Sequence, residues 1–137
     1  MKERIGLAVA EYNSEITSKM SSIAQEHAKK LGAVIERVIN VPGVYEIPYA
    51  VSMLVRDSKI DGVVTIGAVI KGDTNHDEVI AHSVSRKLLD ISIESEKPVS
   101  LGITGPGVTR EQAIKRIESY AMHSVETVVK MLRCFHK

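Results

Sequence analysis

One uninterrupted apolar run constrains the fold of this chain more than any other feature. It has the sequence GVVTIGAVI at residues 62–70, and it ends at the polar stretch KGDTNH, residues 71–76, where a helical pattern begins. A run rich in Val and Ile without alternation is typical of a strand buried on both faces, at the centre of a parallel sheet covered by helices. The polar stretch then lies at the carboxyl edge of that sheet, where open α/β folds bind their ligands.

The rest of the chain alternates between strand and helix patterns. Strands are predicted at residues 4–10, 34–41, 62–70 and 98–104, and helices at residues 16–31, 47–57, 77–96 and from Thr109 onward, with a bend near Ser119 and Tyr120. The composition of Gly105-Pro106-Gly107 predicts a turn before the last helix. Four β-α units imply a parallel sheet with right-handed crossovers. We therefore expect an α/β fold, a flavodoxin-like three-layer sandwich with a four-stranded parallel sheet and helices on both faces.

This arrangement brings all four β-to-α loops to one edge of the sheet. The loops comprise residues 11–14, 42–46, 71–76 and 104–109, and they hold most of the unusual residues of the chain. A single site at the carboxyl edge can draw on all of them.

Size and charge narrow the classes of function. The 137 residues fit one domain, residues 1–137, and 44% hydrophobic content is enough for a core. A net charge of +1 offers no electrostatic footprint for nucleic acid or an anionic membrane, so small molecules or other protein chains are the expected partners. The lone Cys134 and the absence of a signal peptide or membrane span predict a cytoplasmic protein.

Two interpretations of the polar stretch stay open on the residues alone. Gly72, Asp73 and Thr74 precede a helix, so they either present amides and a hydroxyl to a phosphate, or Thr74 and Asn75 cap the helix. His76 stands before two carboxylates that can orient its imidazole for proton transfer near neutral pH. The alternative for His76 is an exposed side chain without a role in catalysis.

Residues of the other loops have similar alternatives. Tyr12 either stacks on a flat heterocycle or packs at the edge of the core. Glu46 either contacts a ligand or is favoured by the dipole of the helix that it begins. Arg116 by default is a solvated charge, and His27 and His82 are expected to be structural. No H-x-x-x-H or H-E-x-x-H spacing occurs, so we expect no metal site.

Three motifs, taken in order, resemble the 6,7-dimethyl-8-ribityllumazine synthases, and the archaeal branch most closely. The segment PGVYEIP, residues 42–48, is similar to their P-G-x-F/Y-E-I/L-P segment. The segment GAVIKGDTNH, residues 67–76, is similar to their G-x-V-I-R/K-G-E/D-T-x-H loop. PVSLG at residues 98–102 and EQA at residues 111–113 are similar to a third pair of motifs, so the resemblance covers nearly the whole chain.

The resemblance implies an enzyme, a transferase of riboflavin biosynthesis. It would condense 5-amino-6-(D-ribitylamino)uracil with 3,4-dihydroxy-2-butanone 4-phosphate, releasing phosphate, and would use no cofactor. Amine attack, phosphate elimination and ring closure require proton transfers and no redox centre. Two alternatives are the archaeal type of riboflavin synthase and a non-catalytic lumazine- or flavin-binding shell protein; neither needs the intact GDTNH loop.

The resemblance also assigns roles to residues. His76 matches the proton-transfer histidine, and Gly72, Asp73, Thr74 and Arg116 match the phosphate-binding positions. The substrate-binding positions are matched by Tyr12, Asn13, Val44, Tyr45, Glu46, Val69, Ile70 and Leu101. Leu101 stands where many relatives place an aromatic residue, so that face of the heterocycle would meet an aliphatic side chain. Family members assemble as pentamers or as icosahedral shells of pentamers with sites between subunits, which implies that Arg116 serves a neighbouring chain.

Overall fold

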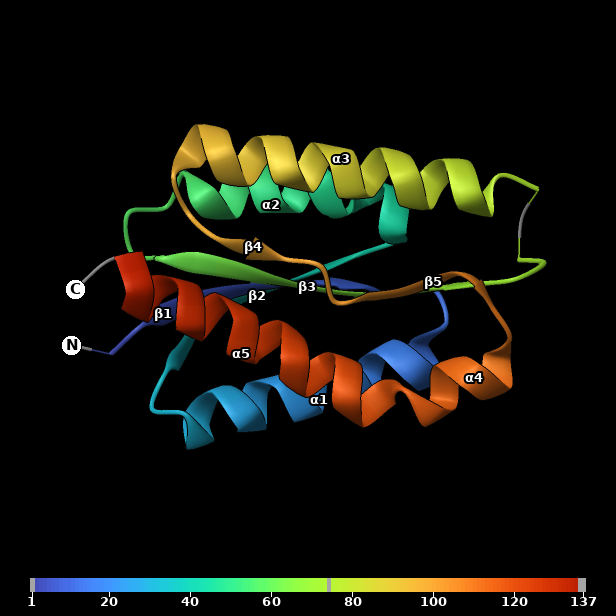
Figure 1. Ribbon diagram of the computed structural model, residues 1–137, viewed down its shortest axis with the longest axis horizontal. Helices are drawn as coiled ribbons and strands as arrows, with labels where there is room; N and C mark the ends of the chain where they lie inside the picture. The colour runs from blue at the N-terminus through green and yellow to red at the C-terminus, as the bar shows by residue number, and fades with distance from the viewer. Residues whose placement is uncertain (1, 74, 136–137) are drawn as a thin grey trace.

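The protein is a three-layer sandwich in which helices cover both faces of one sheet (Figure 1). The computed structural model describes residues 2–73 and 75–135. The strands are β1 (Arg4–Ala10), β2 (Val34–Val41), β3 (Gly62–Ile70), β4 (Val99–Ser100) and β5 (Ile103–Val108). The helices are α1 (Ser14–Lys30), the short 3-10 helix η1 (Val44–Glu46), α2 (Ile47–Val55), α3 (Asp77–Ser95), α4 (Arg110–Lys115) and α5 (Ile117–Phe135).

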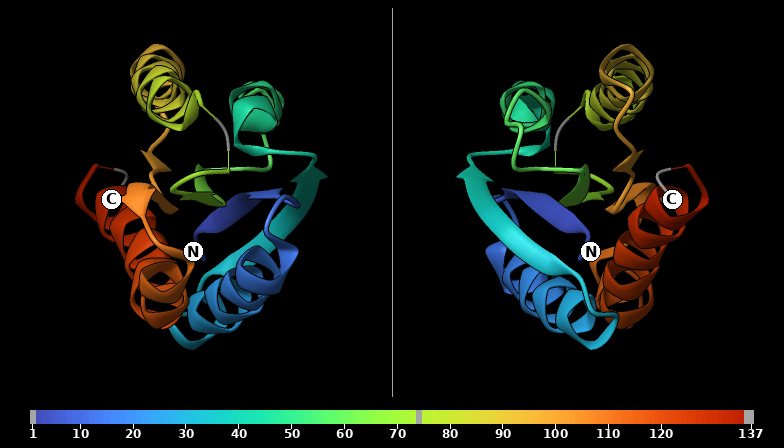
Figure 2. Two further views of the ribbon diagram at one scale, coloured as in Figure 1. Left: turned by 90° about the vertical axis from the view of Figure 1, so that its right-hand side faces the viewer. Right: turned by 90° about the vertical axis from the view of Figure 1, so that its left-hand side faces the viewer.

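The sheet is parallel, with β3 in its interior. The strand order is β2-β1-β3-β4, and β5 pairs with the later part of β3. Helices α2 and α3 lie on one face, and α1, α4 and α5 lie on the other, as the end-on views show (Figure 2). This order and layering confirm the predicted flavodoxin-like α/β fold.

Strand β3 joins two hydrophobic cores, and every residue of it is buried. Val64 and Ile66 belong to the core shared with α1 and α5. Val63 and Val69 belong to the core shared with α2 and α3. Because successive side chains of a strand point to opposite faces, a strand covered on both sides needs apolar residues at nearly every position. The prediction for this run is confirmed.

The predicted fourth strand is wrong in one respect, because the structure divides it into β4 and β5. The division falls at Leu101 and Gly102, opposite the one polar side chain of β3. The hydroxyl of Thr65 donates to the carbonyl of Ser100 at 2.8 Å and accepts the Gly102 N–H at 3.1 Å. These two bonds replace ladder hydrogen bonds at this point, so the strand is interrupted where the Thr65 side chain inserts.

The segment Gly105-Pro106-Gly107 is part of β5, and the prediction of a turn is wrong. Thr104 pairs with Ala68 and Val108 pairs with Ile70, so these three residues bulge opposite the single residue Val69. Pro has no N–H to donate, which an edge strand tolerates, and the two glycines take positive φ angles of 107° and 79°. The chain therefore continues in the same direction toward α4.

The last helical region is interrupted earlier than predicted. Helix α4 ends at Lys115 and α5 begins at Ile117, so the break falls at Arg116 and not near Ser119 and Tyr120. A capping box begins α4, in which Thr109 and Gln112 satisfy each other's backbone N–H groups. Within the described part of the chain, no helix has the length and apolar character needed to cross a membrane.

Candidate functional site

The loops that follow β1, β2, β3 and β5 meet at one edge of the sheet, on the right of Figure 1. The Tyr12 N–H donates to the carbonyl of Pro42 at 3.0 Å, which joins the first two loops. The Lys71 N–H donates to the carbonyl of Val108 at 2.7 Å, which joins the last two. The carboxyl edge is therefore a continuous surface made by four separate segments.

Asn13 is the centre of the hydrogen bonding at this edge. Its backbone is left-handed, with φ 64° and ψ 47°, a conformation that Asn tolerates better than most residues. Its Nδ2 donates to the carbonyl of Ala68 at 3.1 Å and to Oδ2 of Asp73 at 2.9 Å, and its Oδ1 accepts from Nη2 of Arg110 at 3.0 Å. One amide thus connects the loops after β1, β3 and β5.

The loop after β3 turns sharply and leads into α3. Gly72 has a φ of 89° with open space on its Cβ side, and the Asp73 N–H donates to the carbonyl of Ile70 at 3.1 Å. His76 is exposed and occupies the N-cap position of α3, where the carbonyl of His76 accepts the Ile80 N–H at 2.9 Å. Asn75 is not the capping residue, and Thr74 lies outside the described residues.

The loop after β2 forms the helix η1. Val44 is buried in the core, whereas Tyr45 is exposed. The Glu46 N–H donates to the carbonyl of Gly43 at 3.1 Å. A Cβ on Gly43 would lie 3.2 Å from Oε1 of Glu46, so the carboxylate of Glu46 folds back over this glycine. One buried anchor therefore positions an exposed aromatic ring and a half-buried carboxylate.

Val69 and Ile70 contribute backbone to the site, because their side chains are buried in the two cores. The carbonyl of Val69 faces Gly105, where an added Cβ would lie 2.2 Å from the Val69 oxygen. Gly105 also has a φ of 107°, so both space and backbone conformation require glycine there. We call the following group the edge cluster: Tyr12, Asn13, Val44, Tyr45, Glu46, Val69, Ile70, Gly72, Asp73 and His76.

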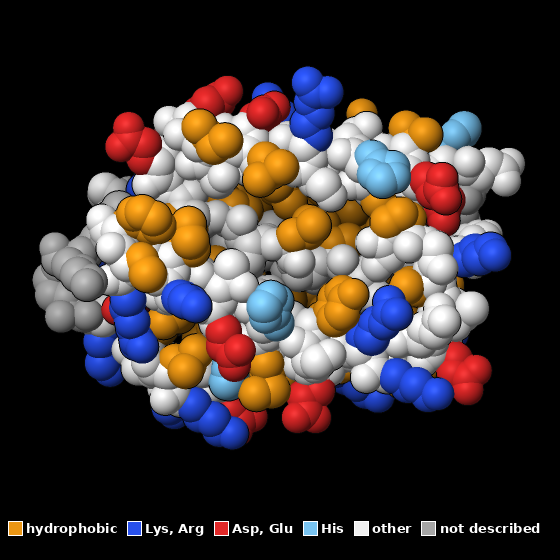
Figure 3. All heavy atoms as spheres, in the orientation of Figure 1, with side chains coloured by type: hydrophobic (Ala, Val, Ile, Leu, Met, Phe, Trp, Pro, Cys, Tyr) orange, Lys and Arg blue, Asp and Glu red, His pale blue; other side chains and the backbone are white. Residues whose placement is uncertain are grey.

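A second region lies beside the edge cluster, between the two helical layers. A groove of about 670 Å³ is lined by Leu101, Ile103, Gly105, Ser119, Tyr120 and His123, and we call it the side groove. Apolar side chains gather along the middle of this face, between α3 and α5 (Figure 3). Leu101 is 53% exposed there. The Arg116 guanidinium lies 5.8 Å from the centroid of the Tyr120 ring, within range of a cation–π contact.

The structure divides the predicted site residues between these two regions. Asn13 and Asp73 are joined directly by a hydrogen bond, and the Tyr12 N–H bonds the carbonyl of Pro42 in the loop that carries Val44, Tyr45 and Glu46. Leu101 instead lines the side groove, and Arg116 lies over the ring of Tyr120, which lines the same groove. Described residues also form no group of three His, Cys, Asp or Glu side chains that could hold a metal ion.

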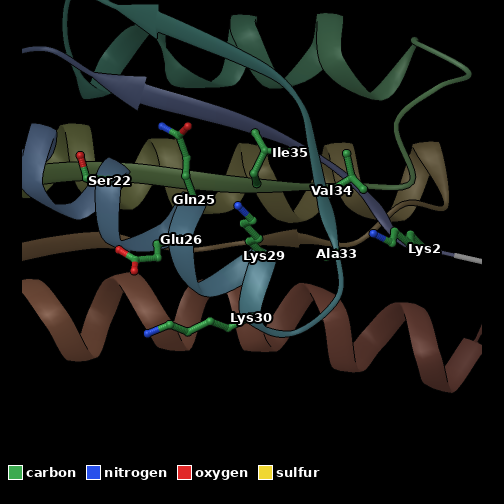
Figure 4. Close-up of a pocket in the computed structure, with 9 residues that line it drawn as sticks. All are labelled: Lys2, Ser22, Gln25, Glu26, Lys29, Lys30, Ala33, Val34 and Ile35. Atoms are coloured by element: carbon green, nitrogen blue, oxygen red, sulfur yellow. The ribbon is translucent and has the colours of Figure 1, made fainter.

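A wider groove of about 960 Å³ lies at the opposite edge of the sheet (Figure 4). It is lined by Lys2, Ser22, Gln25, Glu26, Lys29, Lys30, Ala33, Val34 and Ile35, at the end of α1 and the start of β2. Near this edge Arg4 and Asp61 form an ion pair at 3.2 Å. Burial raises the pKa of the Asp61 carboxyl, but the hydrogen bonds and charge of Arg4 outweigh it, so that the pKa is lowered overall. None of the predicted site residues lines this groove.

Arg110 is a member of the carboxyl edge that the sequence analysis did not single out. Its partners Glu15 and Asn13 are 95 and 97 residues away in the chain. The only local sign was its position directly after the capping residue Thr109, which does not distinguish it from any charged residue in a first helical turn. Tyr120, which stacks near Arg116, was predicted only as a bend in the helix.

The fold defines an open α/β protein whose polar loops gather at the carboxyl edge of its sheet, where proteins of this class bind their ligands. The chain belongs to the 6,7-dimethyl-8-ribityllumazine synthase family, whose sequence model matches residues 2–136.

Archaeal relatives named 6,7-dimethyl-8-ribityllumazine synthase are similar over almost their whole length. The chain is 53% identical to the Pyrobaculum arsenaticum protein over 95% of this chain and 87% of the relative. It is 55% identical to the Metallosphaera sedula protein over 95% and 86%. It is 50% identical to the Methanothermobacter thermautotrophicus protein over 96% and 94%. The predicted resemblance to the archaeal branch is confirmed.

Proposed function

We propose that this protein is an enzyme that condenses 5-amino-6-(D-ribitylamino)uracil with 3,4-dihydroxy-2-butanone 4-phosphate to 6,7-dimethyl-8-ribityllumazine. The observation that carries the proposal is that Asp73 is bonded to Asn13 and His76 begins α3 at the carboxyl edge, in a chain half identical to lumazine synthases. Residues 1–137 act as one domain in this proposal.

The reaction proceeds through several steps that end in closure of a ring, and these steps require proton transfers. The 5-amino group attacks the ketone and water leaves to give an imine. Loss of a proton and of the phosphate follows, and the ribitylamino nitrogen then closes the ring with loss of a second water. His76 is the group we assign to these proton transfers, because histidine is the side chain that most often transfers protons in enzymes and His76 is exposed at the start of α3.

The edge cluster would bind the two substrates. Tyr12 would stack on the pyrimidine with Asn13 beside it, and the backbone of Val69 and Ile70 would bind the edge of the ring. Val44, Tyr45 and Glu46 would bind the ribityl chain, with Glu46 accepting hydroxyl hydrogen bonds. The loop Gly72-Asp73-Thr74 and the guanidinium of Arg116 would bind the phosphate.

We propose further that the site lies between two subunits of a pentamer, which in turn either stays separate or builds an icosahedral shell. Two observations support this: Leu101 lines the side groove with Arg116 over its Tyr120, and large apolar side chains are exposed on α3, among them Leu89 and Ile93. A second chain would cover this surface. Light scattering tests it, with a mass of about 75 kDa expected for five chains of 15.0 kDa.

The single exposed Cys134 fits a cytoplasmic location.

The activity is tested by mixing the purified protein with both substrates and following the absorbance of the lumazine. Formation of lumazine that depends on both substrates would support the proposal. Conversion of added lumazine to riboflavin without the condensation would instead identify the riboflavin synthase type. Binding of lumazine without any turnover would identify a carrier.

A further inference from the structure

We infer that Arg110 is a positioning residue, which acts through the side-chain amide of Asn13 to hold Asp73 and the turn that begins the phosphate loop. The inference rests on the proposed function, because Arg110 would control the shape of the loop after β3, which is proposed to bind the phosphate. It concerns only residues whose contacts the structure describes: Arg110, Asn13, Asp73 and Glu15.

The hydrogen bonds from Arg110 to Asn13 and from Asn13 to Asp73 all donate in the same direction, toward Asp73. A guanidinium only donates and a carboxylate only accepts, so the Asn13 amide has to present Oδ1 to Arg110 and Nδ2 to Asp73. The distances are 3.0 Å from Arg110 Nη2 to Asn13 Oδ1 and 2.9 Å from Asn13 Nδ2 to Asp73 Oδ2. The remaining Nδ2 hydrogen is used by the carbonyl of Ala68 at 3.1 Å. Because each bond polarises the next, the positive charge of Arg110 strengthens the bond to Asp73.

A second contact holds the guanidinium in place. Nη1 of Arg110 is paired with the carboxylate of Glu15, in the first turn of α1, while Nη2 serves Asn13. The two side chains are 47% and 57% exposed, so this ion pair alone contributes little to stability. Its value is geometric, because the planar fork of an arginine can serve two acceptors at once and the ammonium of a lysine is a single point charge.

The Asp73 side chain is bonded at the turn after β3. Gly72 has open space on its Cβ side and takes a positive φ. The polar groups of Asp73 are both engaged: the N–H donates to the Ile70 carbonyl and the carboxylate accepts from Asn13. A carboxylate that turned toward a bound phosphate would repel it. Holding the Asp73 carboxylate against Asn13 therefore fixes the turn and limits the freedom of this charge to approach a phosphate.

Steady-state kinetics of two Arg110 variants test this role. Arg110→Ala is expected to raise the KM for the phosphorylated substrate about tenfold, the usual effect of losing a hydrogen bond to a charged partner. The KM for the uracil and kcat should stay within about twofold. Arg110→Lys should recover only part of the loss. The control is Arg133→Ala, which removes an equally exposed arginine paired with Glu3 at the other end of the molecule and should change nothing.

A double-mutant cycle distinguishes a positioning role from direct attraction of the phosphate. Asn13→Gly removes the amide and keeps the left-handed backbone accessible. If Arg110 acts through Asn13, adding Arg110→Ala to this variant should change the KM by less than about twofold. An equal tenfold increase in both backgrounds would overturn the inference.

Hydrogen exchange at the Asp73 amide tests the same link without turnover. Arg110→Ala should accelerate exchange about tenfold, and Arg133→Ala should leave it unchanged. Unchanged exchange in Arg110→Ala would overturn the inference even in an active enzyme. Accelerated exchange in a chain that forms no lumazine would support the positioning role and reject the proposed function.

Discussion

The edge cluster and the side groove hold the proposed site residues in two different ways. The edge cluster is connected by hydrogen bonds between its own loops, such as those from Asn13 to Ala68 and Asp73. The side groove exposes apolar side chains, including Leu101, with Arg116 stacked near Tyr120 at its end. The first region is preorganised within one chain. The second has the character of a surface that gains stability when another chain covers it.

This difference suggests that the two regions have different functions in the proposed reaction. Groups that carry out proton transfer need fixed geometry, which the loops of one chain supply. The proposed phosphate anchor on a second chain would make binding depend on assembly. The predictions below test this division, beginning with the largest expected effect.

Replacement of His76 should have the largest effect. Loss of a group that transfers protons typically lowers the rate 10²- to 10⁴-fold, so kcat of His76→Ala should fall at least about 100-fold. The matched control is His82→Ala, another exposed histidine of α3, which should keep its activity. A His76→Ala enzyme with normal kcat would show that His76 does not carry out the proton transfers.

Replacement of Arg116 should act on binding and should be rescued by a second chain. Arg116→Ala is expected to raise the KM for the phosphorylated substrate about 30-fold, since a charged hydrogen bond to phosphate is lost. Co-assembly of His76→Ala chains with Arg116→Ala chains should restore about a quarter of the sites in a ring with sites between neighbours. Activity that stays at the level of the separate variants would place both halves of the site on one chain.

Thr65→Val tests the base of the side groove. It leaves the carbonyl of Ser100 and the N–H of Gly102 without their partner, which should destabilise the fold by about 2 kcal/mol. Thr65→Ser keeps the hydroxyl and should retain most of the stability. Thermal unfolding measures the loss, and hydrogen exchange at Asp73 should stay normal if the edge cluster is held independently. A destabilised Asp73 turn would show that the two regions are coupled.

Asp61→Asn serves as a perturbation outside both regions and should have the smallest effect. The pKa of Asp61 is lowered in the folded protein, so its stabilising contribution is complete above the ordinary Asp pKa and is lost as the pH falls through the lowered value. Both partners of its ion pair are partly exposed, so the loss at pH 7 should be about 0.5–1 kcal/mol. Melting curves from pH 7 to pH 3 should converge with those of the unchanged protein at the acidic end, and kcat at pH 7 should not change.

Local pattern was sufficient for the layers of the fold. The residues of β1 and β2 were predicted to the residue, and the run of residues 62–70 was predicted as a strand buried on both faces. Such features depend on the period of apolar residues, which the chain carries locally. The position of the four loops at one edge followed from the connectivity of parallel strands.

Details of the last strand needed the neighbouring strand. From the sequence, Thr65 is only a polar residue that an apolar strand tolerates. The structure shows that its hydroxyl forms hydrogen bonds with Ser100 and Gly102. In the same way, Gly105-Pro106-Gly107 has the composition of a turn, yet pairing on both sides of it keeps it in β5 as a bulge. Composition describes what a segment can do alone, and hydrogen bonding across the sheet selects among those conformations.

The sequence by itself determined the alternation of strands and helices, the burial of β3 and the family motifs of the loops. Each of these features depends on residues that are close together in the chain. Only the tertiary structure decided that Arg110 reaches Asn13. That contact joins residues 97 positions apart in the chain, which the packing of the helices on the sheet brings together. No local period encodes such distances, since they arise from the sum of all the packing in the domain.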